Sequence, residues 1–146
     1  NDIKEIGFKY QMTDLGACLL LESLKEFKKI SSHRKKIFNI YLKKFQKNKF
    51  IRIINETGKF THSTWLFTII TDKKDYLQKK LRLAKIESNQ VHFRNDRYSI
   101  FKSFVKNKRF PNMDFVEKKY LVLPVHTKMT IADAHYVANM INKILT

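Results

Sequence analysis

Three polar residues directly ahead of an expected helix carry groups that could bind a phosphate. Lys9, Tyr10 and Gln11 supply an ammonium, a phenol and an amide, and Thr13 is a good N-cap for the helix that follows. Free N–H groups at a helix N-terminus attract anions, and these side chains would add donors beside them. An ordinary loop before a helix has the same composition, so on the residues alone both interpretations stay open.

The second candidate site is the run from Gln90 to Tyr98, with the sequence Gln-Val-His-Phe-Arg-Asn-Asp-Arg-Tyr. Aromatic rings interspersed with Arg, His and Asp side chains can bind a sugar or a nucleotide. A solvated loop between two apolar segments would have a similar composition. The residues alone do not separate these two interpretations.

Other kinds of chemistry lack the residue patterns they need. The five histidines have no Cys partners and no paired ligand spacing, so we expect no metal site. Cys18 falls in an apolar helical stripe, which predicts a small core residue rather than a nucleophile. A single cysteine predicts a reduced, cytoplasmic protein. The longest apolar run, residues 17–21, is far shorter than the ~20 residues that span a bilayer, so no membrane partner is expected.

Apolar periodicity predicts the elements that would position these residues. Residues 13–47 are expected to form a long helix, with a kink or a new helix start at Ser31-Ser32, since serine favours caps over helix interiors. Strands are expected at 49–55, 62–71 and 121–123, with a hairpin connection at 55–59 and a further extended segment at 86–93. Further helices are expected from an Asp72 N-cap to 85, over 98–105, from an Asn112 N-cap to 120, and from a Thr130–Asp133 capping box to 144.

This order predicts an α/β fold of the two-layer α+β kind, with helices on one face of a small, mainly antiparallel sheet. The long first helix is too long for that sheet to cover. Its early apolar residues, from Leu15 to Leu24, are therefore expected to pack on a part of the protein outside this chain or on a second copy.

The net charge of +17 raises the alternative of a basic module that binds nucleic acid. However, 24 of the 30 basic residues are Lys and only 6 are Arg, the residue that reads nucleic acid best. The lysines are also spread over several expected helices. We therefore regard most of this charge as a solvated surface and nucleic acid as an unlikely partner.

Several motifs, in order along the chain, resemble the C-terminal part of the DegT/DnrJ/EryC1/StrS family of pyridoxal-phosphate-dependent sugar aminotransferases. The stretch Gly7-Phe-Lys-Tyr-Gln-Met-Thr-Asp14 resembles that family's Gly-aromatic-x-Tyr-x-Met-Thr/Ser-Asp/Glu signature. Downstream segments resemble its small-domain strand, the following turn, its Leu-Pro-Leu-His ending and its last capped helix: His62-Ser-Thr-Trp-Leu-Phe67, Lys85-Ile-Glu-Ser88, Leu123-Pro-Val-His126 and Met129-Thr-Ile-Ala-Asp133.

The resemblance implies the small C-terminal domain of a fold-type-I aminotransferase. Residues 1–47 would be an interdomain segment and long helix, residues 48–146 the small domain, and the large cofactor domain would be absent. The implied reaction is amino transfer, usually from glutamate, to a nucleotide-linked keto-deoxysugar in amino-sugar biosynthesis for surface polysaccharide. The implied partner is a second subunit in a homodimer or the missing large domain.

The resemblance also implies roles for particular residues. Gln11, then Tyr10 and Lys9, would approach the phosphate of the cofactor held in the neighbouring subunit. The segment lining the substrate pocket would contribute His92, Arg94, Asn95 and Tyr98. The lysine that forms the cofactor Schiff base would lie upstream of Gly7, so this chain would contain no catalytic residue and would not hold pyridoxal phosphate alone.

One departure from the family pattern concerns the substrate. The commoner family sequence at the pocket segment is His-aromatic-x-Pro-Leu-His, whereas this chain has His92-Phe-Arg-Asn-Asp-Arg-Tyr98. The identity of the sugar is therefore left open. A non-catalytic remnant that pairs with a full-length subunit is the third hypothesis, besides the enzyme segment and the nucleic-acid-binding module.

Overall fold

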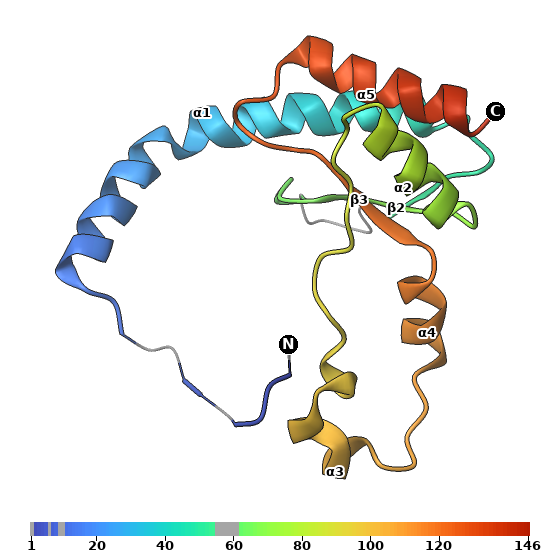
Figure 1. Ribbon diagram of the computed structural model, residues 1–146. Helices are drawn as coiled ribbons and strands as arrows, with labels where there is room; N and C mark the ends of the chain where they lie inside the picture. The colour runs from blue at the N-terminus through green and yellow to red at the C-terminus, as the bar shows by residue number, and fades with distance from the viewer. Residues whose placement is uncertain (1, 6, 9–10, 55–61) are drawn as a thin grey trace.

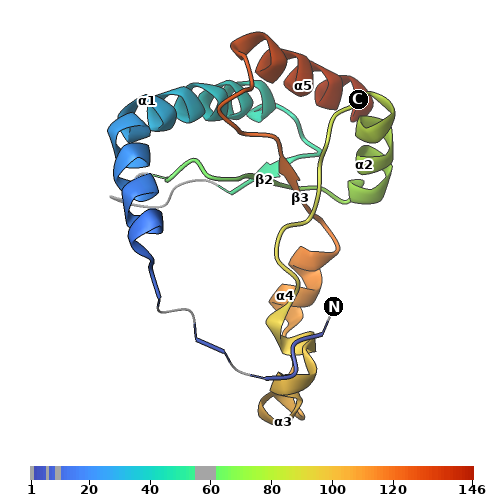
Figure 2. The ribbon, with the colours of Figure 1, turned by 60° about the vertical axis from the view of Figure 1, so that its left-hand side comes forward.

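The computed structural model describes residues 2–5, 7–8, 11–54 and 62–146. Its longest element is helix α1, Asp14–Phe45, of 32 residues (Figure 1). The Thr13 side chain caps this helix by accepting a hydrogen bond from the Gly16 N–H at 3.1 Å. No new helix starts at Ser31-Ser32; α1 runs through both residues and its ribbon curves (Figures 1 and 2). Serine in a helix interior costs only about 0.5 kcal/mol relative to alanine, which is too little to end a helix that packs well further on.

In the described part of the chain, three short strands form one antiparallel sheet in the order β1–β2–β3. Strand β1 is Arg52–Ile53, β2 is Phe67–Ile70 and β3 is Tyr120–Leu123. Ile69 of the central strand pairs with Ile53 on one side and with Leu121 on the other. The strands expected from the sequence are therefore present, though the first two are shorter, and the expected connection at 55–59 lies outside the described residues.

The remaining helices are α2 (Lys74–Leu83), α3 (Lys102–Val105), α4 (Pro111–Glu117) and α5 (Ile131–Ile144). Two short 3-10 turns, Asn95–Arg97 and Ser99–Phe101, precede α3. Helices α2 and α5 and the C-terminal half of α1 lie on one side of the sheet, whereas α3 and α4 lie beyond its end (Figures 1 and 2). This arrangement confirms the expected α/β fold, with helices on one face of a small antiparallel sheet after a long helix.

Helix caps were predicted with mixed success. Helix α5 has the expected capping box, in which Thr130 and Asp133 bond each other's backbone N–H groups. The predicted Asp72 cap is wrong: the N-cap of α2 is Lys73, and Asp72 instead pairs with Lys119 at 2.5 Å. The predicted Asn112 cap is also wrong, because α4 already begins at Pro111, whose fixed φ suits the first helical position.

An aromatic cluster forms the centre of the core. The Phe67 ring of β2 lies 4.6 Å from Phe38, 5.0 Å from Tyr41 and 6.0 Å from Phe45, measured between centroids. All four side chains are buried. The Tyr41 hydroxyl donates to the Pro124 carbonyl at 3.0 Å, and burial raises the pKa of this phenol. The C-terminal half of α1 is thus part of the core.

The N-terminal half of α1 is exposed. We define its exposed apolar surface by six side chains that are 49–72% exposed: Leu15, Leu19, Leu20, Leu21, Leu24 and Phe27. Cys18 lies among them and is exposed as well, so its prediction as a core residue is wrong. Periodicity identifies an apolar surface on a helix, but it does not reveal whether the chain itself covers that surface.

Candidate functional site

The segment from Gln90 to Tyr98 is anchored to the end of the sheet by its backbone. Just before it, Asn89 forms an isolated bridge with Val122 of β3, which is less pairing than the expected extended segment implied. The Tyr120 hydroxyl donates to the Val91 carbonyl at 2.5 Å, and the Gln90 amide donates to the Glu117 carbonyl. These bonds fix the start of the segment against β3 and the end of α4.

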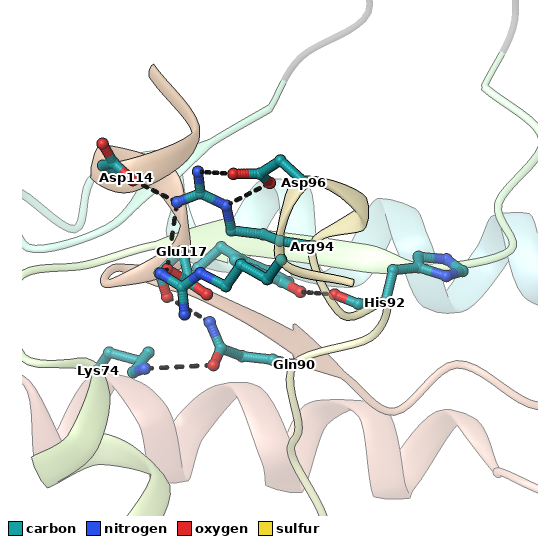
Figure 3. Close-up of polar contacts among 9 residues, drawn as sticks. Lys74, Gln90, His92, Arg94, Asp96, Asp114 and Glu117 are labelled. Atoms are coloured by element: carbon teal, nitrogen blue, oxygen red, sulfur yellow. Dashed lines mark hydrogen bonds and ion pairs between the residues drawn. The ribbon is translucent and has the colours of Figure 1, made fainter. Parts of the chain in front are cut away.

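Arg94 pairs with three carboxylates, and two of them, Asp114 and Glu117, join the segment to α4 (Figure 3). Its Nε and Nη2 atoms donate to the two Asp96 oxygens at 2.9 and 2.7 Å, a bidentate pairing. Its Nη1 atom donates to Asp114 and, at 3.4 Å, to Glu117. The Arg94 side chain is only 6% exposed, so its own carboxylate partners enclose the guanidinium. The observed contacts of Arg94 thus hold the segment in place.

The charges in this cluster stabilise one another. The hydrogen bond to Asp96 raises the pKa of Arg94 above its ordinary value, and the same bond lowers the pKa of Asp96. Arg97 extends the cluster by donating to Glu117 at 2.5 Å. Arg94 and Asp96 are therefore both charged at neutral pH, and the cluster alternates positive and negative groups.

A pocket of about 740 Å³ lies beside this segment. That volume falls in the range of small-molecule sites, roughly 300–1,000 Å³. His92, Arg94 and Asn95 line the pocket, together with apolar side chains that include Met113 and Val122. The structure therefore brings together three of the four residues expected to contact substrate. The fourth, Tyr98, is not a lining residue and packs its ring against Phe93 at 5.1 Å.

His92 adopts a left-handed backbone conformation, with φ of 73°. Its imidazole points away from the Arg94 cluster (Figure 3) and lies 5.9 Å from the Trp65 ring, between centroids. A positive φ is uncommon for residues other than glycine and is found where the surroundings hold the backbone in place. Arg94, which the carboxylates anchor, is two residues after His92, and this anchor helps to fix the backbone that carries the His92 imidazole.

The expected cofactor-binding residues lie in a different part of the chain. Gln11 is exposed and precedes the Thr13 N-cap of α1, whereas Lys9 and Tyr10 lie outside the described residues. The Gln11 amide and the N–H groups of the first turn are donors of the kind that bind a phosphate. Within the described residues, Gln11 does not line the pocket beside His92.

Sequence reasoning did not single out four residues that shape this site: Trp65, Asp114, Glu117 and Tyr120. A signal for two of them existed in the sequence. Asp114 and Glu117 are three residues apart on a short helix, so they share a face and form an acidic pair that could meet a nearby Arg-x-x-Arg segment.

The described residues contain no candidate metal site: among them, no group of three or more His, Cys, Asp or Glu side chains could hold a metal ion. In the same part of the chain no helix combines the length and apolar character needed to cross a bilayer.

Comparison with known sequences identifies relatives over nearly the whole chain. The model of the DegT/DnrJ/EryC1/StrS aminotransferase family matches residues 1–142. The UDP-4-amino-4,6-dideoxy-N-acetyl-beta-L-altrosamine transaminase of Campylobacter jejuni is 27% identical over 150 residues, an alignment that covers 99% of this chain. This chain spans 40% of the length of that relative.

Solved structures support the fold. A sugar aminotransferase from Micromonospora echinospora superimposes with a TM-score of 0.84 and 18% identity, covering 94% of this chain and 37% of that one. A Helicobacter pylori aminotransferase involved in the biosynthesis of pseudoaminic acid gives a TM-score of 0.80 and 18% identity, covering 99% of this chain and 40% of that one.

Proposed function

Because this chain belongs to the DegT/DnrJ/EryC1/StrS aminotransferase family, we propose that it is the C-terminal segment of a pyridoxal-phosphate-dependent enzyme that aminates a nucleotide-linked keto-deoxysugar. The observation that carries this proposal is the family match over residues 1–142. The name of the Campylobacter jejuni relative describes a UDP-sugar with an amino group on carbon 4 and no hydroxyl on carbon 6. The corresponding acceptor is a UDP-linked 4-keto-6-deoxysugar, which we propose as the substrate class.

In this proposal residues 1–47 connect a large cofactor domain to the small domain of residues 48–146. The enzyme works as a homodimer in the cytoplasm, takes its amino group from glutamate and supplies amino sugars for a surface polysaccharide. The exposed apolar surface of α1 supports this arrangement, because such a surface needs a cover that the described part of this chain does not provide.

The donors near the start of α1 fit the phosphate of pyridoxal phosphate. Gln11 would donate an amide hydrogen to a phosphate oxygen, Tyr10 and Lys9 would add a hydroxyl and an ammonium, and the positive end of the helix dipole favours the anion. When bound, the cofactor supplies an electron sink for the carbon that carries the amino group. The residues of this chain bind and orient; we propose that none of its lysines forms the covalent link to the cofactor.

The pocket beside His92 would hold the sugar. The His92 imidazole and the Asn95 amide can hydrogen-bond sugar hydroxyls, and His92 can also accept or release a proton there. Direct substrate contacts by Arg94 and Tyr98 stay predictions. The enclosed guanidinium of Arg94 favours a positioning role, since its Nε, Nη1 and Nη2 atoms already donate to carboxylates.

An amino-transfer assay tests the proposal. The protein encoded by the complete reading frame that contains residues 1–146 should convert a UDP-linked 4-keto-6-deoxysugar to its amino sugar with glutamate as donor. Changing His92 to Ala should lower activity, because the pocket loses its proton-transferring group. The proposal would be contradicted if the encoded protein contains a large domain but is inactive with several nucleotide-linked keto sugars. A reading frame without a large domain would favour the non-catalytic remnant.

A further inference from the structure

A second pocket, of about 440 Å³, lies at another edge of the sheet and shares no lining residue with the pocket beside His92. Four of its ten lining residues are cations: Lys49, Arg52, Lys73 and Lys119. Asp72 is the one carboxylate among the described residues that line it. The cations come from four places in the chain, namely the turn after α1, strand β1, the N-cap of α2 and the residue before β3.

Two phenylalanine rings lie close to three of these ammonium groups. Lys73 Nζ lies 4.0 Å from the centroid of Phe50, and Lys49 Nζ lies 5.5 Å from the same ring. Lys119 Nζ lies 4.2 Å from the centroid of Phe115. Cation–π contacts of this kind restrict flexible lysine side chains before any ligand arrives, which lowers the entropy lost on binding.

The backbone around the pocket is also anchored. The Thr71 N–H donates to the Lys119 carbonyl at 3.0 Å, which ties two sides of the pocket together. The turn that carries Lys49 is fixed by Asn48, which accepts from the Phe50 N–H at 2.9 Å and donates to Asn142 of α5 at 2.8 Å. The positions of the cations therefore follow from the fold and not only from side-chain rotation.

The start of α2 lies beside these cations. Its N-cap residue, Lys73, makes no side-chain capping bond, and its own N–H donates to Thr71 Oγ1 at 3.3 Å. The first turn carries one carboxylate, Asp75, which does not line the pocket and pairs with Lys74 at 3.3 Å. The single lining carboxylate, Asp72, is 82% exposed at its side chain and already paired with Lys119 at 2.5 Å. The lining residues, four cations against one paired carboxylate, therefore give this pocket a net positive charge.

We propose that this pocket, the cationic pocket of Lys49, Arg52, Lys73 and Lys119, binds a diphosphate group, as found in inorganic pyrophosphate or a nucleoside diphosphate. The convergence of four cations on one pocket fits a compact, highly charged anion. A nucleic-acid duplex would instead call for cations arranged along an extended track that follows the phosphate backbone. The site is separate from the pocket beside His92, with which it shares no lining residue, and the proposal does not rest on the proposed amino transfer.

Calorimetric titration of the 146-residue chain with inorganic pyrophosphate at constant ionic strength tests the proposal. The double variant Lys49→Gln/Lys73→Gln should weaken binding by about tenfold or more, since two charge-assisted contacts are lost. The matched control is Lys79→Gln/Lys80→Gln, which removes the same charge from exposed positions on α2 outside the pocket. It should change the affinity by less than about twofold. Circular dichroism establishes that each variant is folded.

A second arm compares UDP with pyrophosphate and maps both by amide chemical shifts in the unsubstituted chain. Both ligands should shift the amides of Thr71 and Lys119, and sulfate at equal ionic strength should not. Equal weakening in the two double variants would overturn the proposal, as would shifts confined to other surfaces. Duplex DNA that binds more tightly than pyrophosphate and is equally sensitive to both variants would also overturn it, in favour of a diffuse polyanion surface.

Discussion

Arg94 shows how a single side chain can determine the shape of a binding segment. Its planar fork takes two oxygens of Asp96 while its Nη1 atom reaches Asp114 and Glu117 on α4. A lysine ammonium carries the same charge, but it cannot make the bidentate contact to Asp96 and the contacts to α4 at once. Geometry more than charge thus makes this residue a link between the segment and the helix.

We therefore predict that Arg94→Lys loosens residues 90–98 while the core stays folded. Amide hydrogens of the segment should exchange faster by about an order of magnitude, since local opening no longer breaks a bidentate pair. Arg97→Lys is the control, because Arg97 is 48% exposed and has its ion pair with Glu117 alone among the described contacts. Exchange that is unchanged in Arg94→Lys would show that the hydrogen bonds of Tyr120 and Gln90 alone fix the segment.

The same cluster predicts a dependence on acid pH. The folded pKa of Asp96 is depressed, mainly by its hydrogen bond to Arg94. The ionised Asp96 therefore contributes to the stability of the fold above its unfolded pKa of about 3.9. That stabilisation is lost as the pH falls through the lower folded pKa. Acid titration followed by the NMR shift of the Arg94 Nε–H should show this loss. In Asp96→Asn the transition should be absent, and a transition that persists would assign it to another carboxylate.

At this scale the sequence could predict part of the site. The resemblance to the aminotransferase family pointed to His92 and Asn95, which do line one pocket. The acidic pair of Asp114 and Glu117 was visible in the sequence, but its pairing with Arg94 was not, because Arg94 and Asp114 are 20 positions apart and meet only through the fold. The same resemblance pointed to Tyr98, yet its ring packs on Phe93 and does not line the pocket.

At the scale of elements, helix ends could be predicted where both partners of a capping bond lie close together in the sequence. The Thr130–Asp133 capping box is such a case, because its donors and acceptors are three residues apart. Asp72 has the right residue type for a cap, but the nearby Lys119 ammonium takes its carboxylate. A partner that is distant in the sequence but close in space thus overrides the local capping preference of Asp72. The residues around Asp72 in the sequence do not reveal this partner.

Thr130→Ala should destabilise the chain by about 1 kcal/mol, the usual cost of losing an N-cap side chain. Thermal or denaturant unfolding monitored by circular dichroism measures this change. Thr127→Ala removes the same hydroxyl from an exposed loop position three residues earlier and should leave stability nearly unchanged. Equal effects of the two substitutions would mean that the capping box contributes little.

Phe67→Ala tests the central strand. The ring contacts three aromatic side chains of α1, so its loss opens a cavity between helix and sheet. We expect a destabilisation of about 3–5 kcal/mol, measured by denaturant unfolding. Phe104→Ala is the control, since that side chain is 65% exposed on α3 and should cost far less. A similar cost for both would contradict the placement of the core under α1.

On the scale of the whole molecule, the chain divides into a packed body and an uncovered helical arm. Buried side chains of α1 begin at Ile37, whereas Leu15 and Leu19 near its start are 72% and 62% exposed. Soluble monomers seldom expose a contiguous apolar surface of this extent, so a cover by another domain or a second copy is expected. The sequence predicted the uncovered surface because the first helix is longer than the small expected sheet can cover.

We predict that the 146-residue chain self-associates through this arm when nothing else covers it. Light scattering should show oligomers that dissociate in Leu19→Glu/Leu20→Glu, because two carboxylates make the surface costly to bury. Leu83→Glu on α2 is the control, as Leu83 is 73% exposed but lies away from the arm. A monomeric unsubstituted chain, or equal dissociation in the control, would contradict the prediction.

The uncovered arm also links helicity to assembly. An isolated helix of fewer than about 12–15 residues is only marginally stable in water, and a slightly longer one is little more stable unless it packs on another surface. Residues 14 to 30, which the body does not cover, should therefore exchange between helix and coil, and any surface that covers Leu19 and Leu24 draws that equilibrium toward helix. The negative far-ultraviolet circular dichroism signal of helix should then increase with the concentration of the partner. The helical content of the chain would therefore measure binding directly.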